Sequence, residues 1–392
     1  MRLLPHLLAP LAASLLLGAC ATPPAVNATG DLGVVIERAS GSVQIVERAP
    51  HRVLSRVEGL GDLSHASLVF SRDARFAYVF GRDGALTKVD LLEQRIVKRS
   101  LQAGNSIGGA ISQDGKLVVA QNYTPGGIKV FDADTLAQLA DIPAVDRDGK
   151  PSKVVGLADL PGNRFAYALF EAGEIWVVDL ADPAKPAIAK YPAGQQPYDG
   201  LVSPEGRYYL AGLFGEDGIA LLDTWHPEQG VKRILPGYGR GEEKLPVYKM
   251  PHLRGWAMTA DRVFLPAIGH HEVLVADKRD WREIGRVKLL GQPVFAMVEP
   301  SHRRVWVNFA FPDNDKVQVV DTETLQVIAT LKPGKAILHM EFSARGDEVW
   351  LSARDSDEVA VFDTRTLRET ARFPSKSPSG IFFAWRANRI GM

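Results

Sequence analysis

The chain has 392 residues, and its 46 Lys and Arg residues balance its 46 Asp and Glu residues, so the formal net charge is zero. This length exceeds the usual single compact core, which predicts either two domains or one large closed architecture. Because the charges balance, the composition gives no sign of the basic surface that nucleic-acid-binding domains carry.

The first twenty residues have the features of a secretion signal. The stretch "MRLLPHLLAPLAASLLLGAC" contains an apolar run that ends in Leu17-Gly18-Ala19-Cys20. Such a run, followed by small residues, is typical of a cleaved signal peptide. The Leu-Gly-Ala-Cys ending resembles a bacterial lipobox, which implies a lipid on Cys20; an ordinary signal peptide with a chance cysteine is the alternative.

We therefore expect a signal peptide over residues 1–19 and a lipid-anchored tether over residues 20–32, which is rich in Pro and small residues. The expected location is the periplasm, with the protein anchored preferentially to the outer membrane. Cys20 is the single cysteine, so a disulfide within the chain and a c-type haem attachment are both excluded.

A short apolar phrase ending in an acidic residue recurs eight times, at spacings of 42 to 54 residues. The copies end at Glu47, Asp90, Asp132, Asp179, Asp223, Asp277, Asp321 and Asp363. A repeat of this length that holds four short strands is typical of a β-propeller blade. In the third repeat the expected strands are 108–112, 116–120, 128–132 and 137–144. We interpret the recurring acid as a turn-former rather than a catalytic group.

The two ends of the repeat array complement each other. The first repeat, residues 33–60, has three strands and lacks an inner one, whereas "SGIFFAW" at 379–385 resembles a lone inner strand. Pairing the two would complete blade one and leave no open edge. The sequence therefore predicts an all-β fold: one eight-bladed β-propeller over residues 33–392, closed by its C-terminal strand.

In a propeller, the loops that lead into the inner strands share one face with the loops that join the second and third strands. Functional residues gather on such loops, over the central channel. The candidates placed there by the repeat register are His65, Arg82, Tyr123, Lys153, Tyr198, Asp199, His252, Arg254, His339 and Arg354. Cations, imidazoles and aromatic rings together suit a flat, polyanionic ligand that carries a metal. For each histidine, a hydrogen-bonded structural role stays open, and the adjacent pair in "GHHE" is expected on a loop.

Several stretches resemble a known family. The stretch "SHASLVFSRDARFAYVFGRDG" looks like the part of the haem d1 domain of cytochrome cd1 nitrite reductases that carries the axial histidine. The stretch "MPHLRGWAM" is similar to the element that supplies an active-site histidine there. The phrases "QPYDGLVSPEGRYYLAGLFGEDG" and "GYGRGEEKLPVYKMPHLRGWAM" look closer to the NirF family of periplasmic haem d1 biosynthesis proteins. The resemblance covers about residues 33–392.

The resemblance implies His65 as the axial iron ligand, Arg82 near the carboxylates of the cofactor, and His252 as one of two distal histidines. The second distal histidine has no counterpart, because "GQPVFAM" has Val294 and Phe295 where it is expected. Nitrite reduction needs proton donors over the iron, so this difference argues against nitrite reductase activity.

The ligand implied by the resemblance is haem d1 or a dihydro-haem d1 precursor. We expect an oxidoreductase-like enzyme that modifies or oxidises side chains of this macrocycle, with His252 and Arg254 assisting proton transfer or stabilising negative charge. One alternative is a periplasmic carrier or scaffold that delivers haem d1 to nitrite reductase without chemistry, and another is a propeller that binds only proteins. Nitrite reductase and other haem d1 assembly proteins are the expected protein partners, besides the tetrapyrrole and the membrane; a homodimer is left open.

Overall fold

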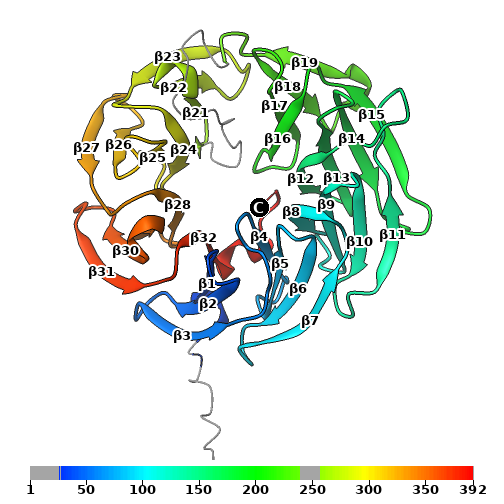
Figure 1. The fold of residues 1–392 in the computed structure, drawn as a ribbon. Helices are drawn as coiled ribbons and strands as arrows, with labels where there is room; N and C mark the ends of the chain where they lie inside the picture. Colours follow the sequence, from blue (N-terminus) through cyan, green and yellow to red (C-terminus); the bar gives the residue numbers. More distant parts are fainter. Residues whose placement is uncertain (1–25, 27, 239–256, 392) are drawn as a thin grey trace, which may run out of the picture.

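The computed structural model describes residues 26, 28–238 and 257–391, so the predicted sites Cys20, His252 and Arg254 lie outside the described residues. Eight four-stranded antiparallel sheets form a closed ring around a central axis (Figure 1). The predicted eight-bladed propeller is thus confirmed. No helix in the described part of the chain is long and apolar enough to cross a membrane.

The strands of the first four blades follow the predicted repeats. Blade one contains β1 (Leu32–Glu37), β2 (Ser42–Glu47), β3 (Arg52–Val57) and β32 (Pro378–Phe383). Blade two contains β4 (Ser67–Phe70), β5 (Phe76–Phe80), β6 (Ala85–Asp90) and β7 (Arg95–Leu101). Blade three contains β8 (Asn105–Ile111), β9 (Leu117–Thr124), β10 (Ile128–Asp132) and β11 (Gln138–Ile142). Blade four contains β12 (Val154–Leu160), β13 (Arg164–Leu169), β14 (Glu174–Asp179) and β15 (Ala187–Pro192).

The remaining blades continue the same pattern. Blade five contains β16 (Pro197–Val202), β17 (Tyr208–Leu213), β18 (Ile219–Asp223) and β19 (Val231–Ile234). Blade six contains β20 (Ala257–Met258), β21 (Arg262–Ala267), β22 (Glu272–Asp277) and β23 (Glu283–Lys288). Blade seven contains β24 (Pro293–Val298), β25 (Arg304–Phe309), β26 (Val317–Asp321) and β27 (Val327–Leu331). Blade eight contains β28 (Ile337–Phe342), β29 (Glu348–Ala353), β30 (Glu358–Asp363) and β31 (Glu369–Pro374).

Apolar side chains pack between neighbouring blades rather than in one central core. A single cluster, for example, joins Val119 and Val130 of blade three to Phe165 and Trp176 of blade four. Second and third strands are therefore almost fully buried, while outermost strands such as β15 are mostly exposed. This explains why the apolar phrase recurs at the same place in each repeat.

The acidic residue that ends seven of the repeated phrases forms a turn, as predicted. The Oδ1 atoms of these aspartates accept backbone N–H groups two or three residues further on, at 2.7 to 3.1 Å. This pattern occurs at Asp90, Asp132, Asp179, Asp223, Asp277, Asp321 and Asp363. In the first repeat, Glu47 pairs instead with Arg52.

Six of the innermost strands carry a β-bulge near their first residues. A bulge frees backbone groups and re-aims side chains, which is common beside binding sites. Polar side chains accept three of the N–H groups near these bulges: Leu157 N binds Gln121 Oε1 at 2.9 Å, Phe295 N binds Asn308 Oδ1 at 2.9 Å, and His339 N binds Ser352 Oγ at 2.8 Å. The inner strands thus keep their amides satisfied while their first residues depart from regular pairing.

The ring closes where β32 pairs with β1, with Val34 opposite Phe382 and Val35 opposite Ile381. The predicted inner strand at 379–385 is therefore confirmed, although β32 itself spans Pro378–Phe383. The first ordered turn, η1 (Thr29–Asp31), also packs on the ring, because Asp31 pairs with Arg48 at 3.1 Å. The end of the expected tether is thus in contact with the propeller.

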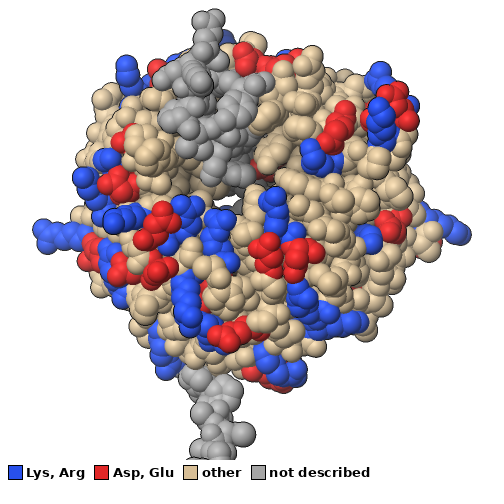
Figure 2. Space-filling model, viewed as in Figure 1, with Lys and Arg blue, Asp and Glu red and all other residues tan. Residues whose placement is uncertain are grey.

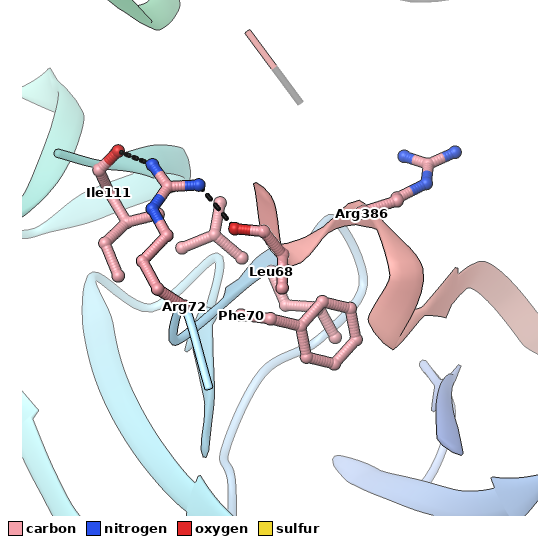
Figure 3. Close-up of a pocket in the computed structure, with 7 residues that line it drawn as sticks. Leu68, Phe70, Arg72, Ile111 and Arg386 are labelled. Carbon is pink, nitrogen blue, oxygen red and sulfur yellow. Dashed lines mark hydrogen bonds between the residues drawn. The ribbon is translucent and has the colours of Figure 1, made fainter. Parts of the chain in front are cut away.

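Beyond β32, η6 (Ala384–Asn388) and the last residues cross the axis at the end of the inner strands, and the C-terminus lies at the centre of the ring in Figure 1. Arg386 pairs with Glu341 of blade eight, with Nε 2.7 Å from Oε1. Gly391 N donates to Asp159 Oδ1 of blade four at 2.9 Å. In Figure 3, the guanidinium of Arg72 from blade two donates to the carbonyl of Ile111, at 2.9 Å, and to that of Ala387.

The C-terminal segment therefore holds three blades together. We call the face that it covers the bottom face. The top face is the opposite one, formed by the loops that lead into the inner strands and the loops between second and third strands. The sequence did not predict this covering, because its contacts join residues far apart in the chain.

Arg386→Ala should lower the free energy of unfolding by about 3 kcal/mol, because Glu341 is fully buried and would lose its charged partner. Urea denaturation measures the change. The control is Arg279→Ala, since Arg279 pairs with Asp277 while 85% exposed and should barely move the midpoint. Equal effects of the two variants would show that the buried pair does not secure the closure.

His339 should make stability depend on pH, because its Nδ1 accepts the N–H of Ile381 at 3.1 Å. Burial, and then the positive charge of Arg386, lower the pKa of His339 to about 3. The unfolded chain takes up this proton near pH ~6.5, so folding loses stability as the pH falls from that value toward 3. In His339→Gln, which keeps an acceptor, the melting temperature should fall less between pH 7 and pH 4.5 than in the unmodified protein. Equal falls would disprove this role.

Candidate functional site

The described candidate residues lie in loops and strand ends of five blades, at the top face. Figure 2 shows a central opening in the ring, with Lys, Arg, Asp and Glu side chains below it in this view. Because the C-terminal segment crosses the bottom face, a ligand that binds at the axis of the ring would enter from the top face. The candidate site is therefore the set of top-face loops around the opening.

His65 and Arg82, the two described residues to which the resemblance assigns roles, lie together in blade two. His65 is exposed in the bend before β4, and Arg82 lies in the turn between β5 and β6. Arg82 Nη1 is 3.5 Å from His65 Nδ1. Arginine only donates, so this contact is a hydrogen bond in the tautomer whose Nδ1 accepts and whose proton is on Nε2. At the long limit of a hydrogen bond, the contact opposes a rotation of the imidazole only weakly.

Two further arginines occupy the position equivalent to Arg82 in the neighbouring blades. Arg38 follows β1 in blade one, and Arg354 begins η5 (Arg354–Ser356) after β29 in blade eight. Burial and then the positive charge of Arg354 lower the pKa of Arg38. Hydrogen bonds from Ser64 lower the pKa of Asp62, and the charges of Arg82 and Arg38 add to this effect.

These electrostatic interactions indicate that the three guanidinium groups lie near one another, on one side of the opening. We call Arg38, Arg82 and Arg354 the arginine side. Arg354 is already paired with Asp355, with Nε–Oδ1 at 2.7 Å and Nη2–Oδ2 at 3.2 Å. The sequence predicted Arg82 and Arg354 but missed Arg38. The repeat register held the signal, since Arg38 follows the second strand of its blade.

Tyr123 and Tyr198 lie on the side of the opening formed by blades three to five. Their hydroxyl oxygens are 3.3 Å apart. The ring of Tyr198 packs against Phe170 and Phe214, each with centroids 6.0 Å away. We call these four rings the aromatic side. The sequence missed Phe170 and Phe214, although each directly follows the second strand of its blade.

Asp199 and Lys153 border the aromatic side. Asp199 follows Tyr198 on the bulge of β16, and its Oδ1 accepts the N–H of Gly200 at 2.8 Å. Lys153 Nζ lies 2.7 Å from Glu171 Oε1 and 4.4 Å from the centroid of Phe170. A ligand carboxylate would therefore compete with Glu171 for this ammonium group. Lys153 is at the predicted place, with its charge already paired.

His339 lies on the bulge of β28, next to the strand that closes the ring. Because its Nδ1 accepts the N–H of Ile381, the proton of the neutral ring is on Nε2. An imidazole in this tautomer has no lone pair on Nε2 for iron, so His339 can act toward a ligand only as a donor. Phe295, at the position where the resemblance expects the second distal histidine, packs edge-on against His339 with centroids 6.2 Å apart.

No group of three or more His, Cys, Asp or Glu side chains among the described residues could hold a bare metal ion. A single exposed imidazole such as His65 fits a metal that arrives already bound in a macrocycle, which needs only axial ligands from the protein. The "GHHE" histidines lie in η4 (Ile268–His270) and at its left-handed end, His271, so the predicted loop is confirmed.

Comparisons with known proteins agree over the whole propeller. The family described as "Cytochrome D1 heme domain" matches residues 27–387. The NirF protein of Pseudomonas aeruginosa is 60% identical over 388 residues, which cover 98% of this chain and 99% of the relative. The NirF protein of Stutzerimonas stutzeri is 58% identical over 385 residues, covering 97% and 98%.

A solved structure extends the comparison to three dimensions. The dihydro-heme d1 dehydrogenase NirN in complex with DHE superimposes with a TM-score of 0.81 and 25% identity, covering 94% of this chain and 78% of that chain. The family match shows that this chain belongs to the Cytochrome D1 heme domain family, and the two full-length relatives show that it belongs to the NirF family.

Proposed function

We propose that the protein is an enzyme of haem d1 biosynthesis, which binds a d1-type tetrapyrrole over the opening of the top face. The observation that carries the proposal is the exposed imidazole of His65 beside the arginine side. The solved dehydrogenase, which is related over 94% of this chain, is described in complex with DHE. A tetrapyrrole of the same kind, haem d1 or its dihydro precursor, is the ligand that we propose.

The described residues would bind different parts of the ligand. His65 would ligate the iron after its contact with Arg82 opens or its proton moves to Nδ1. Arg38, Arg82 and Arg354 would pair with ligand carboxylates, and a charge-assisted hydrogen bond contributes about 1.5–3 kcal/mol. Iron, when bound, supplies the redox chemistry of the macrocycle. The protein would orient the macrocycle, and the C-terminal segment would close the bottom face beneath it.

For the reaction we propose a modification of macrocycle side chains, or their oxidation by an external electron acceptor. His252 and Arg254, outside the described residues, are the proposed groups for proton transfer and for stabilising negative charge. The phenylalanine packed against His339 leaves no second distal acid at that place, which supports a role other than nitrite reduction. His339, held neutral, would only donate a hydrogen bond.

A carrier that delivers haem d1 to nitrite reductase is the second candidate. The observation that favours it is that the described residues proposed for binding, His65 and the arginine side, would serve a carrier equally well. We also propose periplasmic attachment to the outer membrane through a lipid on Cys20, which membrane fractionation of a Cys20→Ser variant tests. Nitrite reductase and other assembly proteins are the proposed partners, and a homodimer stays open.

His65→Ala should abolish the axial-ligand features in the visible spectrum of the haem d1 complex and raise its Kd at least about tenfold, because one iron–nitrogen bond is lost. A spectrophotometric titration measures both changes. The control is His302→Ala, since His302 lies in a turn of the bottom face, between β24 and β25. An unchanged spectrum and Kd for His65→Ala would contradict the proposed site.

His252→Gln should separate the two functions in cells that lack the native protein. An enzyme that uses His252 as an acid or base should lose activity, so a tetrapyrrole precursor accumulates and nitrite reductase stays inactive. Mass spectrometry of the extracted tetrapyrroles identifies the blocked step. Full nitrite reductase activity with His252→Gln, together with loss in His65→Ala, would favour the carrier instead.

A further inference from the structure

The two hydroxyl groups of Tyr123 and Tyr198 form an incomplete hydrogen-bond chain. At 3.3 Å, one phenol donates to the other, which uses one of their two protons. Among the described residues, neither hydroxyl has a further hydrogen-bond partner. One O–H of the pair is therefore available to a third group. Both side chains are only partly buried, so that group can come from outside.

Packing holds the pair in place before any ligand binds. Tyr198 is wedged between Phe170, at an interplanar angle of 79°, and Phe214, at 49°. The strand that carries Tyr198 is fixed by the close approach of two glycines, since a Cβ on Gly156 would lie 2.1 Å from Gly200 N. A preorganised donor loses little entropy when it binds an acceptor.

The surroundings of the pair favour an uncharged partner over a carboxylate. Burial, followed by Tyr198 and the carboxylate of Asp199, raises the pKa of Tyr123, so the phenol is neutral. The negative charge of Asp199 would repel a second carboxylate. Lys153, the ammonium group at this side, is already paired with Glu171.

A neighbouring amide supports the same conclusion. The register of β8 and β9 places Asn105 opposite Thr124, beside Tyr123. The Oδ1 atom of Asn105 is buried and has no hydrogen-bond partner among the described residues. Buried polar atoms in native proteins almost always have partners, so this acceptor calls for a hydrogen-bond donor, which an ionised carboxylate cannot supply.

We propose that Tyr123 and Tyr198 form a subsite that donates a hydrogen bond to an uncharged oxygen of the bound macrocycle, such as a ring carbonyl. The inference rests on the proposed tetrapyrrole binding and adds an orientation to it. The arginine side would take the ligand carboxylates, and the aromatic side would take a ring edge with neutral oxygen. The two sides would thus fix which edge of the macrocycle faces which blade.

The test compares two probes in spectrophotometric titrations of the full-length protein. Haem d1 carries ring carbonyls, whereas the oxygen acceptors of protohaem are all carboxylates. The double variant Tyr123→Phe/Tyr198→Phe removes both hydroxyls and keeps the rings. It should raise the Kd for haem d1 about tenfold and leave the Kd for protohaem within about twofold, as expected for the loss of one buried hydrogen bond.

The control variant is Tyr191→Phe on the outermost strand β15, which should leave both Kd values unchanged. An unchanged thermal midpoint checks that the double variant is folded. Equal weakening of both probes, or of neither, would overturn the inference and leave the proposed function standing. Failure of the unmodified protein to bind either probe would overturn the proposed function, and the inference with it.

Discussion

The pairing of β32 with β1 is the constraint on which the rest of the structure depends. A ring of sheets has no free strand edge only when its last strand joins its first, and here the two partners lie at opposite ends of the chain. This pairing brings the C-terminal residues to the axis, where Arg386 reaches Glu341 and Gly391 reaches Asp159. Closure of the ring and covering of the bottom face therefore both result from the pairing of β32 with β1.

Near the top face, the inner strands approach the axis closely and also depart from regular strand pairing. They converge on the axis, and their bulges leave backbone amides without regular partners. The protein uses Gln121, Asn308, Ser352 and His339 as acceptors for amides of these strands. A polar residue near the opening is therefore not evidence of ligand binding by itself. His339 illustrates the point, because its Nδ1 serves the strand that closes the ring.

Arginines and aromatic rings occupy different sides of the opening. Arginines gather on blades eight, one and two, whereas tyrosines and phenylalanines gather on blades three to five. They lie near the end of the second strand of a blade, directly after it, or near the start of an inner strand, so one repeated geometry carries different chemistry at each position. An opening with arginines on one side and aromatic rings on another would suit a flat ligand with carboxylates at one edge and neutral groups at another. The same scaffold accommodates such differences because most of the packing between blades comes from the strands, although Tyr123 and Tyr198 also pack against the cluster that joins blades four and five.

The sequence by itself determined the number of blades, the strand order, the aspartate turns and the closing strand, because each depends on a local pattern of apolar, turn-forming and acidic residues. It also identified His65, Arg82, Tyr123 and Tyr198 as top-face residues from their place in the repeat. The tertiary structure alone decided which of these side chains meet: Tyr123 and Tyr198 are 75 positions apart, and His339 and Ile381 are 42 apart. No periodicity encodes such contacts, since they arise when the curvature of the closed ring sets the distance between blades. Arg38, Phe170 and Phe214 follow the second strands of their blades, so the repeat register marked their positions, but only the structure shows which side chains they meet.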